Sequence, residues 1–306
     1  IYALDQETGE KKWSFNTVDS EDIWGNPQVN SGGGAWYPPA IDSVTGLMYW
    51  GIGNPAPWPG TKDFPNGSSR PGPNLYTDSI IALDAKNGEL KWFTQVLPHD
   101  LFDLDLQISP ILTSATIKGK FREIVIGSGK LGKVYAFDRT TGDILWQTAV
   151  GEHMNDDLTT LPEGITTVLP GPLGGVETPM AYADGVVYVP VVNLSAGYTP
   201  TELVASSIDF SKGTGELVAL DVNTGAILWD NKFGSSNFGA ATVVNNVVFT
   251  ATFDGKIYAF DSKFGKELWT YQAAGGINGW PAAAGDTILF PVGLGTPPQL
   301  IAFKLK

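Results

Sequence analysis

The sequence lacks cysteine altogether and contains only two histidines, His99 and His153. Without cysteine there can be no disulfide, no thiolate-bound metal and no covalently attached haem, while the compartment stays open. Two histidines exclude a histidine-rich metal site and disfavour a Ser-His-Asp triad, and His99, next to Pro98, is expected to be structural. No run of about 18 apolar residues is present, so we predict no transmembrane segment. The formal net charge of −13 argues against nucleic acid or an anionic membrane as a partner.

What the sequence does have is a phrase that occurs five times: a small residue and a hydrophobe, Asp, three residues, Gly, three residues, Trp. The Asp, Gly and Trp of the five copies are Asp5, Gly9 and Trp13; Asp84, Gly88 and Trp92; Asp138, Gly142 and Trp146; Asp221, Gly225 and Trp229; and Asp261, Gly265 and Trp269. Strand formers precede each Asp and follow each Gly, so each copy predicts a β-hairpin. We expect the Asp to cap the turn and the Gly to supply its positive φ. The Trp should bury its ring against the neighbouring unit, where its indole N–H needs a partner.

A fixed phrase of this kind predicts an all-β repeat fold, a β-propeller with tryptophan docking, and not a series of independent domains. Successive tryptophans lie 79, 54, 83 and 40 residues apart. The shortest interval is about the size of one four-stranded blade, roughly 40 to 50 residues. The chain starts inside a phrase at Ile1, and residues 300–303 repeat the strand that precedes the Asp. Both ends thus supply the same strand, and we expect residues 1–306 to be one propeller region that is truncated at its N-terminus.

The longest insertions are expected to carry function, because loops on a repeat scaffold usually do. One of them contains Trp36 and then the run Gly51-Ile52-Gly53-Asn54-Pro55-Ala56-Pro57-Trp58. Asn54 follows a predicted strand and precedes a proline, which keeps it out of helical φ/ψ and fixes the direction of its amide. Asn54 is therefore either a ligand on a rigid loop or an Asn that closes a turn.

A second insertion contains Asp103 and Asp105, with Phe102, Leu104 and Leu106 between and beside them. Strand alternation would place the two carboxylates on one face and the apolar side chains on the other. Adjacent carboxylates repel unless a cation lies between them or one is protonated, so the pair predicts a metal or a raised pKa. The alternative is a solvated strand face in an acidic protein.

Lys130 lies in Gly127-Ser128-Gly129-Lys130-Leu131-Gly132. This is not a phosphate loop, because the Walker spacing is absent and a strand follows. Lys130 is either a single directed ammonium or an ordinary exposed lysine. Residues 154–180 form a loop rich in Thr, Pro and Gly, which we expect to be a surface excursion and not a cover over a site.

Taken together, these residues resemble the pyrroloquinoline quinone (PQQ)-dependent, or quinoprotein, alcohol dehydrogenases. The run from Gly51 to Trp58 matches the family's Gly-Thr-Gly-Asn-Pro-Ala-Pro-Trp almost letter for letter, and the order Pro98-His99-Asp100…Asp103 matches as well. The repeat phrase alone is less specific, since outer-membrane assembly lipoproteins share it. The resemblance implies an eight-bladed β-propeller of which this chain holds about four complete blades plus partial blades, in the C-terminal half or somewhat more.

The resemblance also assigns roles to residues. Trp36 corresponds to the ring on which the quinone stacks, Asn54 to the amide ligand of the metal, and Asp103 to the catalytic carboxylate that takes the alcohol proton and also faces the metal. Asp105 corresponds to the extra carboxylate of lanthanide-using members, although some calcium-using sugar dehydrogenases carry Asp there too. Lys130 corresponds to the basic residue that reaches the quinone oxygens. Three further cofactor contacts are implied at Asn193, Phe238 and Trp280.

The implied chemistry is hydride transfer from an alcohol, or from a sugar or polyol, to PQQ, with Ca²⁺ or a lanthanide as Lewis acid. An oxygen-rich site suits such hard cations better than zinc. A separate electron acceptor, a cytochrome or a quinone, and a periplasmic or extracytoplasmic location are implied as well. The family's upstream metal-binding Glu and its adjacent-cysteine disulfide are missing, so we expect this chain alone to bind PQQ weakly or not at all. The main alternative is a non-catalytic propeller that serves as a scaffold for protein–protein interaction, in which Trp36, Asn54 and Asp103 would not converge.

Overall fold

The computed structural model describes residues 1–304, and nearly all its regular structure is β-strand. Four antiparallel sheets in this range have four strands each. The first consists of β4 (Ala40–Asp42), β5 (Leu47–Gly51), β7 (Ser79–Asp84) and β8 (Leu90–Gln95). The second consists of β9 (Ile111–Ile117), β10 (Lys120–Gly127), β11 (Lys133–Asp138) and β12 (Ile144–Ala149). The third consists of β14 (Ala181–Ala183), β15 (Val186–Asn193), β18 (Thr214–Asp221) and β19 (Ile227–Phe233). The fourth consists of β20 (Thr242–Val244), β21 (Val247–Ala251), β22 (Lys256–Asp261) and β23 (Glu267–Gln272).

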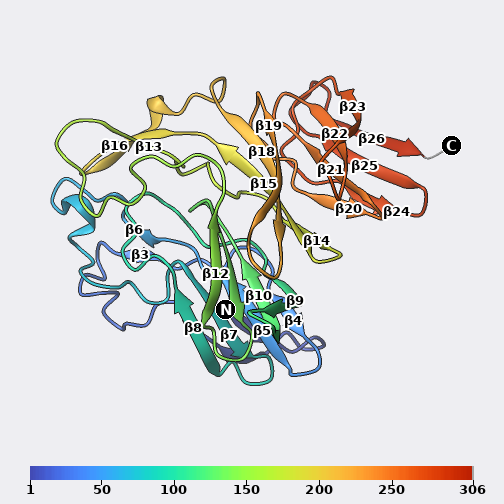
Figure 1. Ribbon diagram of the computed structural model, residues 1–306. Helices are drawn as coiled ribbons and strands as arrows, with labels where there is room; N and C mark the ends of the chain where they lie inside the picture. Colours follow the sequence, from blue (N-terminus) through green and yellow to red (C-terminus); the bar gives the residue numbers. More distant parts are fainter. Residues whose placement is uncertain (305–306) are drawn as a thin grey trace.

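Partial sheets lie at the two ends of this series. The first pairs β1 (Tyr2–Leu4) with β2 (Lys11–Ser14), and the last consists of β24 (Ala282–Ala284), β25 (Thr287–Val292) and β26 (Gln299–Lys304). The sheets follow one another in an open arc, and the two chain ends lie apart (Figure 1). The predicted arrangement of about four complete blades plus partial blades is confirmed.

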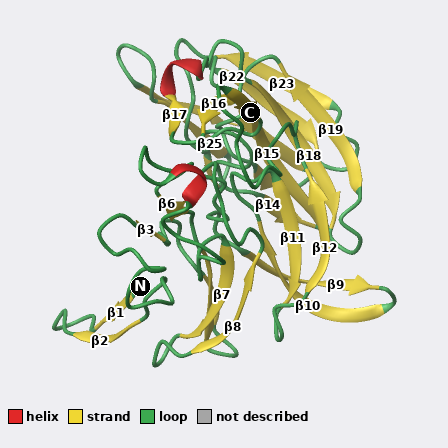
Figure 2. Cartoon of the chain, turned by 90° about the vertical axis from the view of Figure 1, so that its left-hand side faces the viewer, coloured by secondary structure: helices red, strands yellow, loops and turns green. Residues whose placement is uncertain are grey.

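The insertions form small structures of their own beside the blades. Their strands are β3 (Ser31–Gly32) with β6 (Pro55–Ala56), and β13 (Thr166–Val168) with β16 (Ala196–Thr199) and β17 (Glu202–Val204). Two short 3₁₀ turns, Pro65–Gly67 and Ala205–Ser207, are the helical segments in residues 1–304, and neither could cross a bilayer. Figure 2 shows these loops and turns gathered on one side of the long blade strands.

The turn of each repeat phrase is built as its sequence predicts. In the third copy, Oδ1 of Asp138 accepts the backbone N–H of Thr140 at 3.0 Å, and Gly142 has a φ of +78°. The other four copies have the same kind of aspartate contact and a positive φ at the glycine. The phrase therefore fixes the hairpin between the last two strands of a blade.

Four of the five tryptophans dock on the next blade, which confirms that prediction as well. Nε1 of Trp146 donates to the carbonyl of Val222 at 3.0 Å, and the ring covers Gly225 so closely that a Cβ there would lie 2.7 Å from it. The three other docked rings are Trp13 on Ala85, Trp92 on Arg139 and Trp229 on Ser262. Glycine is required at these turns by its positive φ and by the approach of the ring.

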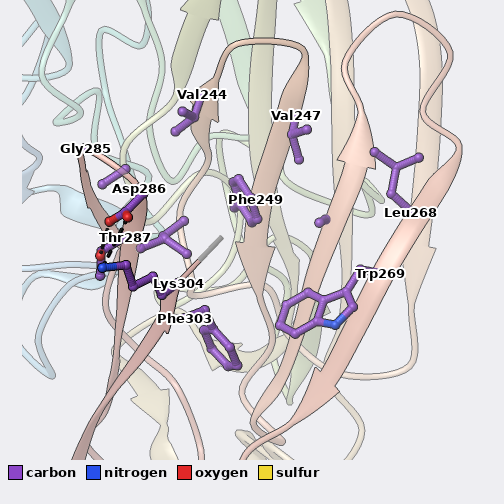
Figure 3. A pocket seen from close by; sticks show the side chains of 13 residues that line it. Val244, Val247, Phe249, Leu268, Trp269, Gly285, Asp286, Thr287, Phe303 and Lys304 are labelled. Carbon is purple, nitrogen blue, oxygen red and sulfur yellow. Dashed lines mark hydrogen bonds and ion pairs between the residues drawn. The ribbon is translucent and has the colours of Figure 1, made fainter. Parts of the chain in front are cut away.

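Trp269, in the last copy, differs from the other four. Its side chain is 39% exposed, and within residues 1–304 its indole N–H donates to no carbonyl. It lies with Leu268, Phe249 and Phe303 on the wall of an apolar cavity of about 420 Å³ between the last two sheets (Figure 3). Within residues 1–304 the cavity thus lies between two sheets that are not joined by a tryptophan dock.

Candidate functional site

Three separate stretches of chain meet around the carboxylate of Asp105. Oδ1 of Asp105 accepts the backbone N–H of Asn54, in the turn that follows β5, at 2.5 Å. A Cβ at Gly53 would lie 2.6 Å from Oδ1 of Asp105 and 3.1 Å from Nε1 of Trp36. The glycine before Asn54 is therefore what lets Trp36, Asn54 and Asp105 come together.

Lys130, which follows β10, is bound between two carboxylates. Its Nζ lies 2.8 Å from Oδ2 of Asp103 and 2.7 Å from Oδ2 of Asp105. The same nitrogen lies 5.3 Å from the centroid of the Trp36 ring, whose side chain is 53% exposed. Trp36, Asn54, Asp103, Asp105 and Lys130, called here the charged cluster, thus form one site. Lys130 is buried, so the interpretation of it as an ordinary exposed lysine is wrong.

The segment that carries the two aspartates is not the strand that alternation predicted. Residues 101–107 are irregular, and Asp103 has a φ of +65°. The reason is Asp100, whose carboxylate accepts the backbone N–H groups of Phe102 at 2.7 Å and Leu104 at 2.6 Å. Those amides are therefore unavailable to a strand partner. The alternative of a solvated face is also wrong, because Asp103 and Asp105 are both buried.

The apolar residues of this segment still point away from the carboxylates, into the core. Phe102, Leu104 and Leu106 are buried in one cluster with residues of the neighbouring blades, and the Tyr198 hydroxyl donates to the carbonyl of Phe102 at 2.9 Å. This packing holds the irregular backbone in place, so Asp103 and Asp105 are presented from a rigid base.

Burial and mutual repulsion shift the protonation equilibria of the cluster. Burial raises the pKa of Asp103 to about 8, because the attraction of Lys130 does not offset burial together with the repulsion of Asp105. Burial lowers the pKa of Lys130, but Asp105 and Asp103 more than offset it, so the pKa of the ammonium lies above its usual range. A carboxyl with a pKa near neutrality is suited to accept or release a proton.

Glu177 is a residue of this site that the sequence did not reveal. Its Oε1 is buried and accepts no hydrogen bond from residues 1–304, although the residue as a whole is partly exposed. Burial raises its pKa to about 8, Lys130 opposes that shift, and Asp105 and Asp103 add to it. The only sequence signal was a lone Glu in a loop without a repeat phrase.

The end of the loop 154–180 is not the surface excursion that we expected, although residues 162–165 of the same loop are exposed. Val176 donates its backbone N–H to the carbonyl of Gly129 at 3.0 Å, and Gln107 donates its side-chain amide to the carbonyl of Val176 at 3.3 Å. These contacts attach the end of the loop to the stretch that carries Lys130. For this end of the loop the prediction failed, because loop composition does not report which backbone groups a loop will pair with.

Asp78 is a further buried acid near the cluster, and its backbone N–H donates to the carbonyl of Gly53 at 3.2 Å. Both of its carboxylate oxygens are buried and without a hydrogen-bond partner in residues 1–304, and its φ is +49°. Burial, and next the charge of Asp100, raise the pKa of Asp78 well above its usual range. Asp100 itself has its pKa raised to about 6 by burial.

The other three residues assigned by resemblance lie on later blades. Asn193 lines a separate polar cavity of about 300 Å³, where its side chain accepts from the backbone N–H of Glu152 at 2.9 Å and donates to Glu216 at 3.1 Å. Phe238 packs against Phe253 with ring centroids 5.6 Å apart, and Trp280 is 52% exposed. Within residues 1–304 no hydrogen bond, ion pair or aromatic contact joins these three to the charged cluster. Their assignment stays a prediction.

The donors of the charged cluster fit a hard cation. Ca²⁺ and lanthanides prefer oxygen donors, and the cluster offers two carboxylates and the amide oxygen of Asn54. The amide nitrogen of Asn54 donates to the carbonyl of Pro55, which leaves the amide oxygen as a ligand. No three acidic or histidine side chains among residues 1–304 already form a ready metal-ligand group. The positive charge between the carboxylates is the Lys130 ammonium, so the site accommodates a cation at this point.

His99 has the structural role that the sequence predicts. Its ring nitrogens contact the carbonyls of Gly72 at 3.2 Å and Asn66 at 3.5 Å. Burial lowers its pKa below the usual range.

Comparison with known proteins places the chain in a family. The model of the glucose/ethanol/alcohol dehydrogenase β-propeller domain matches residues 1–156, and that of the outer membrane protein assembly factor BamB matches residues 130–296. The lanthanide-dependent methanol dehydrogenase of Methylorubrum extorquens is 30% identical over 91% of this chain and 56% of its own length. The quinohemoprotein alcohol dehydrogenase of Comamonas testosteroni is 27% identical over 92% of this chain and 47% of its own length.

The fold agrees with these matches. The crystal structure of the quinohemoprotein alcohol dehydrogenase from Comamonas testosteroni superimposes with a TM-score of 0.80 at 24% identity, over 95% of this chain and 52% of that one. The chain spans about half the length of the relatives it matches. It belongs to the PQQ-dependent, or quinoprotein, alcohol dehydrogenase family, as a stretch of that family's β-propeller.

Proposed function

We propose that this chain is the C-terminal part of the propeller of a PQQ-dependent dehydrogenase that oxidises an alcohol. The observation that carries the proposal is the convergence of Trp36, Asn54, Asp103, Asp105 and Lys130 in one cluster, whose charged members are buried. A non-catalytic propeller has no need for buried carboxylates, because each costs free energy unless it is paired.

In this proposal PQQ, when bound, supplies the hydride acceptor, and Ca²⁺ or a lanthanide supplies Lewis acidity. The residues of the chain bind, orient and move protons. Asp103 takes the hydroxyl proton of the substrate, which its raised pKa suits. Trp36 offers an exposed flat ring for stacking, and Asn54, Asp103 and Asp105 supply oxygen ligands. Lys130 directs its ammonium at the quinone oxygens, and Asn193, Phe238 and Trp280 are proposed as further cofactor contacts.

The substrate is a primary alcohol, with a sugar or polyol as the second choice within the same chemistry. Electrons pass to a separate acceptor, a cytochrome or a quinone. We place the protein outside the cytoplasm, in the periplasm or an equivalent compartment, as the resemblance to the family implies.

The proposal is tested by titrating PQQ with Ca²⁺ or La³⁺ into the 306-residue chain, and into a longer protein that includes the preceding blades. The longer protein should bind PQQ and reduce a dye in the presence of alcohol, and Asp103→Asn should lower kcat by at least about a hundredfold. The chain alone should bind weakly or not at all. Tight stoichiometric binding of PQQ by the chain alone would contradict the expectation that the chain lacks part of the site. If the longer protein did not reduce the dye in the presence of alcohol, the proposed dehydrogenase activity would be wrong.

A protein-binding scaffold is the second candidate, since the assembly-factor model matches residues 130–296. It predicts that substitution of Asp103 leaves the protein's activity in cells unchanged.

A further inference from the structure

His153 is one of the two histidines of the chain, and the proposed function gives it no role. Its partly buried ring lies between two oxygens: Nδ1 is 2.7 Å from Oδ2 of Asp156, and Nε2 is 3.2 Å from the carbonyl oxygen of Gly132. A backbone carbonyl and an ionised carboxylate can only accept hydrogen bonds. Both contacts are therefore hydrogen bonds at the same time only when both ring nitrogens donate, and only the imidazolium has two N–H groups.

The charged groups around the ring favour this protonated state. The hydrogen bond to Asp156 raises the pKa of His153 above its usual value of 6.5, although burial and the ammonium of Lys133, at the start of β11, oppose the shift. Burial raises the pKa of Asp156, but the hydrogen bond and the charge of His153 more than offset burial, so this pKa lies below its usual range. The acid beside the ring is therefore ionised when the ring is protonated.

The contact with Gly132 fastens the long loop after β12 to the turn that carries Lys130. The N–H of Gly132 closes this turn by donating to the carbonyl of Gly129 at 3.0 Å. The loop holds one end of the turn through His153 and the other end through the bond from Val176 to Gly129. A Cβ at Gly132 would lie 3.1 Å from Cε1 of His153, so glycine leaves room for the ring. Of these two attachments, the one at His153 contains a titratable side chain.

Loss of the proton leaves the ring one N–H for two acceptors. The carboxylate of Asp156 is the stronger acceptor, because a hydrogen bond to an ionised group is stronger than one to a neutral carbonyl. The remaining N–H therefore stays with Asp156, and the lone pair of Nε2 then faces the carbonyl oxygen of Gly132 and repels it. We propose that His153 is a pH-dependent latch: as an imidazolium it bridges Asp156 and Gly132, and on losing its proton it releases the glycine.

His153 is thus a positioning residue, which acts on Lys130 through the backbone of Gly132. Because the pKa of His153 is raised, the latch is complete below its usual value of 6.5 and is lost as the pH rises through the raised value. Neither PQQ nor a cation takes part in the latch. The latch can therefore fail while the proposed function stands, and it can hold if that function is wrong.

The first part of the test follows both histidines of the 306-residue chain by ¹H–¹³C correlation of their ring Cε1–H groups, from about pH 5 to pH 9. We expect the pKa of His153 to lie above 6.5 and that of His99, which burial lowers, to lie below 6.5. Asp156→Asn should lower the pKa of His153 because it removes the carboxylate. Asp157→Asn is the matched control and should leave it unchanged, since Asp157 is the exposed neighbour.

The second part measures whether the turn loosens when the ring loses its proton. Hydrogen exchange gives the protection of the backbone amides in residues 129–133, corrected for the intrinsic effect of pH on exchange. This protection should fall about tenfold as the pH rises through the pKa of His153, which corresponds to the loss of one hydrogen bond. His153→Gln has no titratable ring, so its protection should change by less than about twofold. Circular dichroism verifies that each protein stays folded over the same range.

Three results would overturn the latch. If the pKa of His153 lies at or below 6.5, or if Asp156→Asn leaves it unchanged, the ring is not held as an imidazolium by the carboxylate. If the pKa is raised but the protection of residues 129–133 does not fall, the pair of His153 and Asp156 forms without holding the turn. If the fall persists in His153→Gln, another group causes it.

Discussion

The tryptophan docks and the charged cluster are held together by opposite means. A dock is local and repeated: one ring, one glycine turn and one carbonyl, as in Trp146, Gly225 and Val222. The cluster is assembled once, from segments near residues 36, 54, 105 and 130. Docks stabilise the chain by burying apolar surface, whereas the cluster buries charges that each need a partner. The apolar surface buried at the tryptophan docks therefore offsets the free energy that burial of the charged cluster costs.

The largest effect should come from removing a docked ring. Trp146→Ala should cost about 3 to 5 kcal/mol of unfolding free energy, because it empties a buried interface between two blades. Trp269→Ala is the matched comparison: it removes the same kind of ring where the ring is partly exposed and not docked, and it should cost about 1 kcal/mol or less. Urea denaturation measures both values. Equal losses would show that the undocked tryptophan carries as much stability as the docked ones.

A second comparison separates the turn from the ring that covers it. Gly142 and Gly9 have φ values of +78° and +73°, but a Cβ would lie 2.5 Å from the Trp92 ring at Gly142 and would meet nothing within 4 Å at Gly9. Gly9→Ala should cost about 1 kcal/mol, from the left-handed backbone alone. Gly142→Ala should cost about 2 to 4 kcal/mol, because overpacking adds to that strain. If the two variants lose the same free energy of unfolding, glycine is needed at these positions for the conformation of the turn and not for contact with the docked ring.

The same contrast explains how much could be predicted from the sequence. The docks follow from one short repeated phrase, so the roles of Asp138, Gly142 and Trp146 are predictable from the amino-acid pattern alone. The members of the charged cluster were found by resemblance, but their geometry was not. The strand predicted for residues 101–107 failed because Asp100 takes the amides of Phe102 and Leu104, which is a local competition that alternation does not report.

Glu177 was missed for a different reason. It is placed by contacts between segments that lie far apart in the chain, such as the bond from Val176 to Gly129. A loop of Thr, Pro and Gly residues gives no sign of such pairing, because its composition suits a surface loop equally well.

Because Asp78 is buried, the free energy of unfolding should depend on pH. The pKa of Asp78 is raised by burial, so its contribution to stability is complete below the ordinary aspartate pKa and is lost as the pH rises toward the raised value. Asp78→Asn keeps the shape without the charge. It should reduce the fall in unfolding free energy above pH 4 by about 1.4 kcal/mol per pH unit at most.

The control for this pH measurement is Asp157→Asn, since Asp157 is exposed. Its pH profile should overlay that of the wild type. A profile of Asp78→Asn that also overlays the wild type would mean that Asp78 gains a partner in solution.

The smallest expected effect tests the edge of the charged cluster. Trp36 and Trp280 are about equally exposed, at 53% and 52%, but of these two rings Lys130 lies over that of Trp36 alone. Trp36→Ala should therefore cost about 0.5 to 1 kcal/mol more than Trp280→Ala, which is the size of an exposed cation–π contact. When Tb³⁺ is titrated into the chain with excitation of tryptophan, only Trp36→Ala should remove the sensitised emission of the bound ion. Loss of emission in Trp280→Ala as well would extend the site to a later blade, because energy transfer to the cation requires the donor ring to lie near it, and would support the role that the sequence resemblance gives to Trp280.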